Sequence, residues 1–104
     1  MPHIIRLQSA WEVSSSAGTT CHSRNFGQPR TLDAHERVWL VCQGVPGKTE
    51  VTLNGKVIAE NREKEPFSVD ITDHLQPRNR VQFLVVSTEK LGEVTLEIRS
   101  DAIN

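Results

Sequence analysis

The sequence contains no tyrosine, and aromatic residues make up only 5% of its 104 positions. Aromatic rings are the usual platforms on which proteins stack sugars and bases, so few side chains are available for such a surface. Neither sign of charge is in excess, because 12 basic and 13 acidic residues leave a net charge of -1. Without a global positive field, the composition gives no indication that the protein binds nucleic acid or an anionic membrane.

Long apolar runs and a cysteine framework are also missing. The longest clean apolar run, FLVVS, has the length of a strand and falls far short of the ~20 residues that cross a bilayer. The start, MPHIIRLQSAW, has no basic segment followed by an apolar run. We therefore expect no signal peptide and a cytoplasmic location, with a piece of a longer or secreted protein as the alternative. Cys21 and Cys42 fit neither a disulfide framework nor a zinc motif; we expect small thiols in strands, and whether they meet stays open.

Apolar and polar residues alternate with a period of two along most of the chain. A chain of this length is expected to form one domain, residues 1–104, with its own core. In the first expected strand, the residues that face one way are Ile5, Leu7, Ser9, Trp11 and Val13. A loop is expected at 14–20, and further strands at 21–26, 37–44, 50–53, 56–60, 66–72, 80–87 and 93–100. About eight short strands of this kind predict an all-β antiparallel sandwich or barrel.

The segment EVTLNGKVIAE, residues 50–60, predicts a hairpin that turns at Asn54-Gly55. This dipeptide supplies the two positive φ angles of a type I′ turn. In the later segment TDHLQP, we expect one helical turn, capped by Thr72 or Asp73 and ended by Pro77. The charged segment NREKE, residues 61–65, is expected to form a solvated loop.

Several segments carry a combined pattern in this order: LQSAWEV, CHSRNF, RVWLVCQGV, EVTLNGK and PFSVDITDHL. The pattern resembles that of the N-terminal jelly-roll domain of family 2 glycoside hydrolases, the β-galactosidase, β-glucuronidase and β-mannosidase type of enzyme. The resemblance spans nearly the whole chain and implies a galactose-binding-domain-like jelly roll, a β-sandwich. The matching residues are Leu7, Trp11, Arg24, Phe26, Arg37, Val38, Leu40, Gly44, Val45, Val51, Leu53, Asn54, Gly55, Lys56, Pro66, Phe67, Asp70, Ile71, Thr72, Asp73 and Leu75.

The chain also departs from the family pattern. His22 stands where the family usually has Tyr, Cys42 where it has Phe, and Arg78 where it has the turn Gly. In the enzymes, this domain precedes an immunoglobulin-like domain and a barrel that carries two catalytic glutamates. These 104 residues include neither. We therefore expect a non-catalytic protein without a cofactor.

The carboxylates and histidines support the same expectation. Glycosidase chemistry needs two carboxyl groups roughly 5 to 9 Å apart, one of them protonated. Asp70 and Asp73 are close in sequence, but capping and bonds to backbone amides account for both. The four histidines have no spacing typical of metal ligands, so no metal site is expected. A structural calcium ion is a weaker alternative that no motif supports; its oxygen ligands would come from Glu12, Asp70, Glu97 and Asp101.

Carbohydrate binding is the first functional hypothesis, because the resemblance implies a domain of the sugar-binding type. A sugar site needs an aromatic ring and polar groups for the hydroxyls. Trp11 shares a face with apolar residues and is expected in the core, whereas Trp39 is expected to point outward. The candidate ligand-binding residues are Trp39 as a stacking ring, or His22 and Arg24 together with Asn54 and Lys56.

Association with a partner domain or a second copy is the alternative hypothesis. Alternation places Val41 beside Trp39 on the outer face of one sheet, and Leu84 and Val86 on the outer face of the other. Exposed apolar patches are typical of interaction surfaces. The sequence names no ligand and does not decide which outer face is functional.

Overall fold

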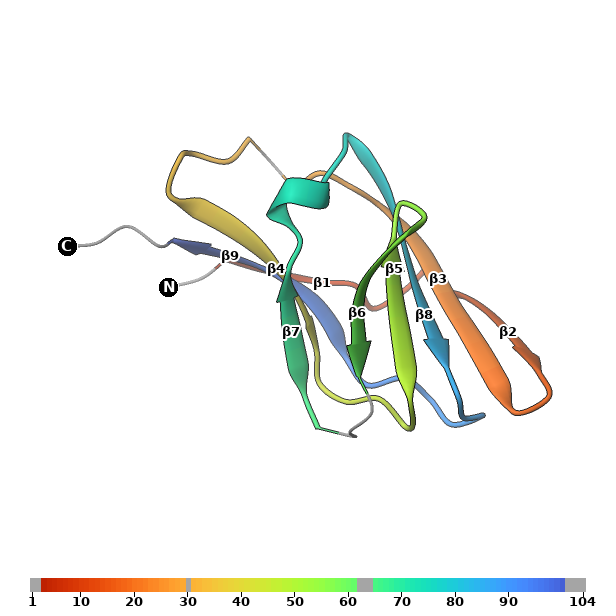
Figure 1. Cartoon of the computed structure of the whole chain (residues 1–104). Coiled ribbons are helices and arrows are strands. Elements are labelled where there is room, and N and C mark those ends of the chain that lie inside the picture. Colours follow the sequence, from red (N-terminus) through yellow and green to blue (C-terminus); the bar gives the residue numbers. More distant parts are fainter. Residues whose placement is uncertain (1–2, 30, 62–64, 101–104) are drawn as a thin grey trace.

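Two antiparallel β-sheets pack face to face in the computed structural model, which describes residues 3–29, 31–61 and 65–100 (Figure 1). The four-stranded sheet has the order β1 (His3–Arg6), β9 (Val94–Ser100), β4 (Glu36–Cys42) and β7 (Phe67–Asp70). The five-stranded sheet has the order β2 (Glu12–Ser16), β3 (Thr19–Gly27), β8 (Arg78–Val85), β5 (Thr49–Leu53) and β6 (Lys56–Asn61). This architecture confirms the predicted all-β antiparallel sandwich. Within the described residues, no helix is long and apolar enough to cross a bilayer.

The core lies between the sheets and is built from the alternation seen in the sequence. Val81, Phe83 and Val85 of β8 are fully buried and face the inward side chains of β9 and β4. Full burial of each such side chain contributes about 1.5–3 kcal/mol. The other buried apolar residues predicted to face inward are Val38, Leu40, Cys42, Val51, Leu53, Ile71, Val94, Leu96 and Ile98.

The prediction of one continuous strand from Ile5 to Val13 is wrong. β1 ends at Arg6 in one sheet, and β2 begins at Glu12 in the other. Between them the chain crosses the sandwich, with Ala10 at a φ of 65°. The alternating pattern continues through both strands without a Gly or Pro to mark the crossing, so the sequence conceals it.

The loop predicted at 14–20 is also wrong, because these residues form a second hairpin. β2 and β3 pair in a regular register and turn at Ala17-Gly18, whose φ angles are 53° and 82°. Two positive φ angles define a type I′ turn. Serine and glycine are typical of turns and loops, so the composition of this segment obscured its strands. β3, expected to be a weak strand, is nine residues long.

The hairpin turn at Asn54-Gly55 and the short helical turn are confirmed. Asn54 and Gly55 have φ angles of 53° and 82°, and Thr72–His74 forms a 3-10 turn, η1. The predicted cap is wrong, because no side chain caps this turn. Instead, Oδ1 of Asp70 accepts hydrogen bonds from the Thr72 backbone N–H (3.0 Å) and hydroxyl (2.7 Å). Residues 62–64 of the predicted charged loop lie outside the described residues.

Asn79 is a buried polar residue at the start of β8, only 4% exposed. Its Nδ2 donates to the carbonyl oxygens of Phe26 (3.4 Å) and Gln76 (2.8 Å). Its Oδ1 accepts from the Gln76 backbone N–H (2.8 Å) and from Nδ2 of Asn54 (3.1 Å). All the polar atoms of this side chain are therefore paired, as burial requires.

Asn54 extends this network to the hairpin tip. Its Nδ2 also donates to the His74 carbonyl oxygen (3.1 Å), and its Oδ1 accepts from the Arg80 backbone N–H (2.9 Å). The tip of the β5–β6 hairpin, η1 and the start of β8 are thereby fixed together at one end of the sandwich (Figure 1).

Asn79→Ala is expected to lower the free energy of unfolding by about 2–3 kcal/mol, because buried or partly buried backbone groups of Phe26 and Gln76 lose their partner. Urea unfolding followed by circular dichroism measures the loss. The matched control is Gln76→Ala, an exposed amide truncated three residues away, which should change stability by no more than about 0.5 kcal/mol. Equal losses in the two variants would contradict this role for Asn79.

Candidate functional site

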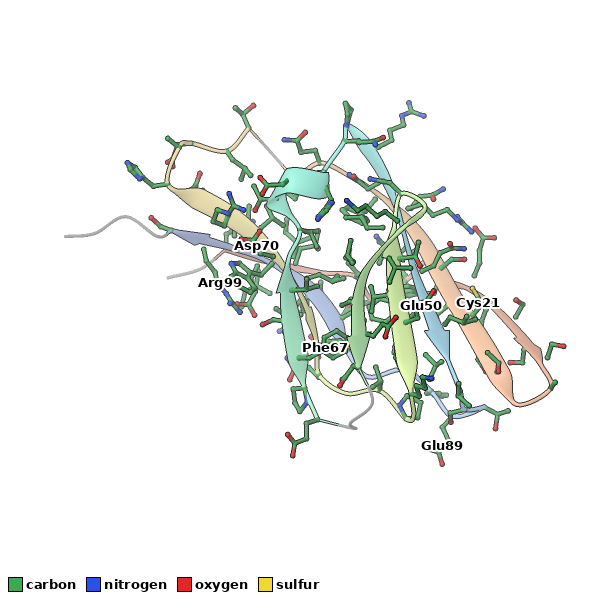
Figure 2. The ribbon with its side chains drawn as sticks, viewed as in Figure 1. Cys21, Glu50, Phe67, Asp70, Glu89 and Arg99 are labelled. Atoms are coloured by element: carbon green, nitrogen blue, oxygen red, sulfur yellow. The ribbon has the colours of Figure 1, made fainter. Side chains whose placement is uncertain are left out.

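Trp39 lies at the centre of the outer face of the four-stranded sheet, where it is half-buried. Its cross-strand neighbours are Asp70 on β7 and Glu97 on β9. The guanidinium carbon of Arg99 lies 4.8 Å from the centroid of the Trp39 ring, and Arg99 also pairs with Glu97 at 3.1 Å. Figure 2 shows Asp70 and Arg99 on this side of the sandwich. One face of the predicted stacking ring is thus occupied by a cation.

Val41 faces outward as predicted, but the expectation that it forms an exposed patch with Trp39 is wrong. Val41 points away from the core cluster, yet it is only 8% exposed. β4 is an interior strand, so Thr95 and Ser68 flank Val41 on both sides. A small side chain between two strands is shielded even on an outer face.

The carboxylates of the DITD segment are held by one arginine. Nε of Arg37 lies 2.8 Å from Oδ2 of Asp70, and its second amino group lies 3.2 Å from Oδ2 of Asp73. Burial alone raises the pKa of Asp70, but hydrogen bonds from Arg37 and Thr72 outweigh it and hold that pKa below its usual value. Asp70 therefore stays ionised at neutral pH and stabilises the fold; it is not placed to act as a proton donor.

The other four predicted ligand contacts do not meet in one place. His22 and Arg24 lie on the inward face of β3, whereas Asn54 and Lys56 belong to the β5–β6 hairpin, with β8 between these elements. Nε of Arg24 donates to the Ser9 carbonyl oxygen at 2.6 Å, and the Asn54 amide is used within the fold. Of these four side chains, only His22 lines the cavity beside the β2–β3 hairpin.

This cavity, of about 710 Å³, is lined by residues of the β1–β2 crossing, the β2–β3 hairpin and the segment after β8. Figure 1 shows that the β2–β3 hairpin extends past the four-stranded sheet. Its apolar wall includes Leu7, Trp11 and Leu91, and its polar wall includes Ser15 and His22. Pockets of a few hundred to a thousand cubic ångströms, apolar with a few polar groups, are typical of small-molecule sites.

Trp11 is the only Phe, Tyr or Trp side chain among the described residues that line the cavity. Its indole N–H donates to the Leu7 carbonyl oxygen at 2.7 Å. Its ring meets Phe83 edge-on, with centroids 6.0 Å apart and an interplanar angle of 70°. These contacts fix the indole at the edge of the core, half-buried and in contact with the cavity.

The opposite lip is the segment after β8, and hydrogen bonds hold it in place. Oγ1 of Thr20 donates to the Ser87 carbonyl oxygen at 2.6 Å. Gly92 donates its backbone N–H to the Gly44 carbonyl oxygen at 2.9 Å. A side chain at residue 92 would clash, because its Cβ would lie 2.7 Å from that oxygen. The cavity is therefore preformed on both sides, with Glu89 at this end of the sandwich (Figure 2).

His22 is the unusual polar residue of the cavity. It is 7% exposed, and within the described residues its Nε2 is buried and makes no hydrogen bond. Burial lowers the pKa of His22, so the imidazole is neutral at pH 7. A buried polar atom without a partner costs about 1–3 kcal/mol. His22 lines the cavity, while Nε2 itself has almost no accessible surface.

The outer face of the five-stranded sheet carries Leu84 and Val86, which are 44% and 57% exposed as expected. Half-buried Cys21 lies on the same face, opposite Leu84, while Cys42 is buried in the other sheet. The two thiols are free and do not meet. No group of three or more His, Cys, Asp or Glu that could hold a metal ion occurs within residues 3–29, 31–61 and 65–100; Asp101, one proposed calcium ligand, lies outside them.

No protein-family model matches the sequence, and no curated protein sequence matches it. Solved structures do. A β-glucuronidase from an uncultured Clostridium sp. matches with a TM-score of 0.81 at 16% identity, over 95% of this chain and 29% of that one. The FMN-binding β-glucuronidase from Faecalibacterium prausnitzii L2-6 matches with a TM-score of 0.80 at 20% identity, over 96% and 23%. A β-glycosidase from Bacteroides vulgatus matches with 0.66 at 21%, over 81% and 12%.

The fold is that of the N-terminal domains of family 2 glycoside hydrolases. The resemblance predicted from the sequence is thereby confirmed. Identities of 21% and below establish the fold alone, and the chain spans less than a third of the length of these enzymes. Activity and substrate do not follow from the likeness.

Sequence reasoning missed most of this cavity. Trp11 was assigned to the core, and Ser15 and Thr20 to a loop, yet all three line the cavity. Only the β2–β3 hairpin brings them together, and its Ala-Gly turn is a far weaker signal than Asn-Gly. The sequence contained one signal. His22 stands where the family pattern has Tyr, at a position that faces the inside of the sandwich.

His22→Leu is expected to raise the free energy of unfolding at pH 7 by about 1 kcal/mol, because it removes an unpaired buried polar group. The pH dependence should change as well. The wild-type protein loses stability as pH falls from about 6.5, where the unfolded imidazole takes up a proton, through the lower pKa of the folded state. The variant lacks this loss.

Urea unfolding between pH 7.5 and pH 5 measures both effects, read as the difference between variant and wild type. The control is His35→Leu, the same substitution at an exposed position, which should change stability by at most about 0.5 kcal/mol. A marked destabilisation by His22→Leu would show that the imidazole is structural.

Proposed function

We propose that this domain is a non-catalytic carbohydrate-binding module whose ligand occupies the cavity beside Trp11 and His22. One observation carries the proposal: a preformed cavity of about 710 Å³ is lined by His22, whose buried Nε2 lacks a partner within the described residues. The fold gives independent support, because it occurs as one part of enzymes that act on glycosides. A neutral imidazole can exchange a hydrogen bond with a hydroxyl, and an indole suits the apolar face of a pyranose.

The absence of catalysis is part of the proposal. Glu89 and Glu93 line the cavity, but both are exposed, and Glu93 pairs with Arg6 at 3.7 Å. A glycosidase acid is kept protonated by an apolar pocket, and neither glutamate has one. Asp70 and Asp73 are held by Arg37 on the other sheet, away from the cavity.

Titration calorimetry with a panel of sugars tests the proposal. The panel comprises methyl glycosides of glucose, galactose, mannose, N-acetylglucosamine and glucuronic acid. It also includes coumarin-3-O-glucuronide, which is bound in a structure of Bifidobacterium dentium β-glucuronidase that matches 97% of this chain with a TM-score of 0.80 at 13% identity. At least one compound should bind with a millimolar or tighter Kd, and His22→Leu should weaken it about tenfold or more.

Trp39→Phe is the matched control, because it leaves Trp11 as the sole tryptophan. It should bind the same sugar with unchanged Kd, and Trp11 fluorescence should report the binding. Silence of the whole panel at about 10 mM ligand would sink the proposal. Binding that is lost in Trp39→Phe but kept in His22→Leu would show that the sugar binds on the outer face of the four-stranded sheet instead.

Binding of a partner protein is the second candidate function, favoured by the exposure of Leu84 and Val86. These side chains lie on the outer face of the five-stranded sheet, opposite the face that lines the cavity. The double variant Leu84→Ser, Val86→Ser should therefore leave sugar affinity unchanged. It would lose any complex that depends on this patch.

A further inference from the structure

β2 is an open edge of the five-stranded sheet. It pairs with β3 on one side only, and all five of its residues are exposed. Figure 1 shows it as the outermost strand of its sheet, with no described segment beyond it. An unpaired edge presents a row of N–H and C=O groups that can hydrogen-bond to another strand.

The register of the hairpin identifies which groups are free. Ser16 and Thr19 flank a two-residue type I′ turn, so they form a hydrogen-bonded pair. Bonded and non-bonded pairs alternate along an antiparallel ladder. The N–H and C=O groups of Glu12, Ser14 and Ser16 therefore point toward β3. Those of Val13 and Ser15 point outward, away from β3 and in the plane of the sheet. Among the described residues, no loop or turn bond uses these outward groups.

The other three sheet edges carry features that discourage strand pairing. β1 carries Arg6, and β7 is only four residues long and follows Pro66. β6 begins with Lys56 and pairs through a register irregularity. Basic residues, proline, bulges and short length are the usual devices that protect edges. β2, with the sequence EVSSS, has a regular register and no Lys, Arg or Pro.

We propose that β2 pairs with β2 of a second copy, antiparallel about Ser14, and joins the two five-stranded sheets into one. In this register, Val13 of each copy faces Ser15 of the other, and both pairs exchange N–H···O bonds in both directions. Every outward peptide group of both strands is then used. Glu12 faces Ser16, so no like charges oppose each other.

The pairing has a consequence for the cavities. A two-fold axis normal to the joined sheet keeps the inward faces of both copies on the same side. Val13, 59% exposed, and Ser15 line the cavity and lie on that side. The two cavities then adjoin, and the exposed Val13 side chains are partly covered. This dimer does not depend on whether a sugar binds.

Residue 14 lies on the two-fold axis, and this position makes a sharp test possible. Ser14→Lys places two lysines opposite each other, and Ser14→Glu places two glutamates. Because Ser14 is exposed on the outer side of β2, neither change disturbs the core. Each variant alone should dimerise roughly fivefold more weakly or worse than wild type, whereas an equimolar mixture should recover a heterodimer. Sedimentation velocity over a concentration series up to about 1 mM measures these species.

The matched controls are Ser68→Lys and Ser68→Glu, the same changes at an exposed serine on edge strand β7, which should leave the dimer unchanged. Circular dichroism and urea unfolding establish that all variants are folded. A wild-type protein that is monomeric up to about 1 mM would overturn the proposal. A dimer that is unaffected by the changes at residue 14 would also overturn it. This includes a dimer that is lost in the double variant Leu84→Ser, Val86→Ser. Failure of the mixture to recover a dimer would exclude the antiparallel register about Ser14.

Discussion

The hydrogen bond from the Trp11 indole to the Leu7 carbonyl oxygen closes the crossing between the two sheets, and much of the molecule depends on it. It fixes the point at which the chain leaves β1 and enters β2. The crossing is short and the Trp11 ring contacts Phe83 edge-on, so β2 lies next to β3 on the side away from β8. There it extends the five-stranded sheet past the cover of the other sheet. The cavity and the open edge both arise from this one displacement.

Polar groups in this domain fall into two kinds. Asn79, Asn54 and the Arg37–Asp70 pair have partners for their polar atoms and fix loops to strands. His22 is nearly as buried as Asn79, but its Nε2 makes no bond within the described residues. Satisfied groups rigidify a fold, whereas an unsatisfied one reduces its stability. Unsatisfied groups are expected at functional sites, and His22 is therefore the basis of the proposed sugar site.

The comparison with larger enzymes gives the exposed surfaces a context. The matched structures are three or more times longer than this chain, so their corresponding domains sit within larger proteins. Here β2 and the Leu84–Val86 patch are exposed in the chain as described. Exposed edges and apolar patches on a sandwich are costly unless another surface covers them. A second copy of the same chain can provide such a covering surface, and its chemistry is known.

The alternation of residues by itself determined the layers of the sandwich, because inward-facing positions such as Val81, Phe83 and Val85 must be apolar wherever two sheets meet. The Asn54-Gly55 turn was equally local, since positive φ angles depend on the residues of the turn themselves. The candidate site, in contrast, depends on segments that are distant in the sequence. Its parts come from the crossing at Trp11, the inward face of β3 and the segment after β8. Period-two alternation is the same whether a chain continues in one sheet or changes to the other, so only the tertiary structure could decide where β2 lies and what gathers beside it.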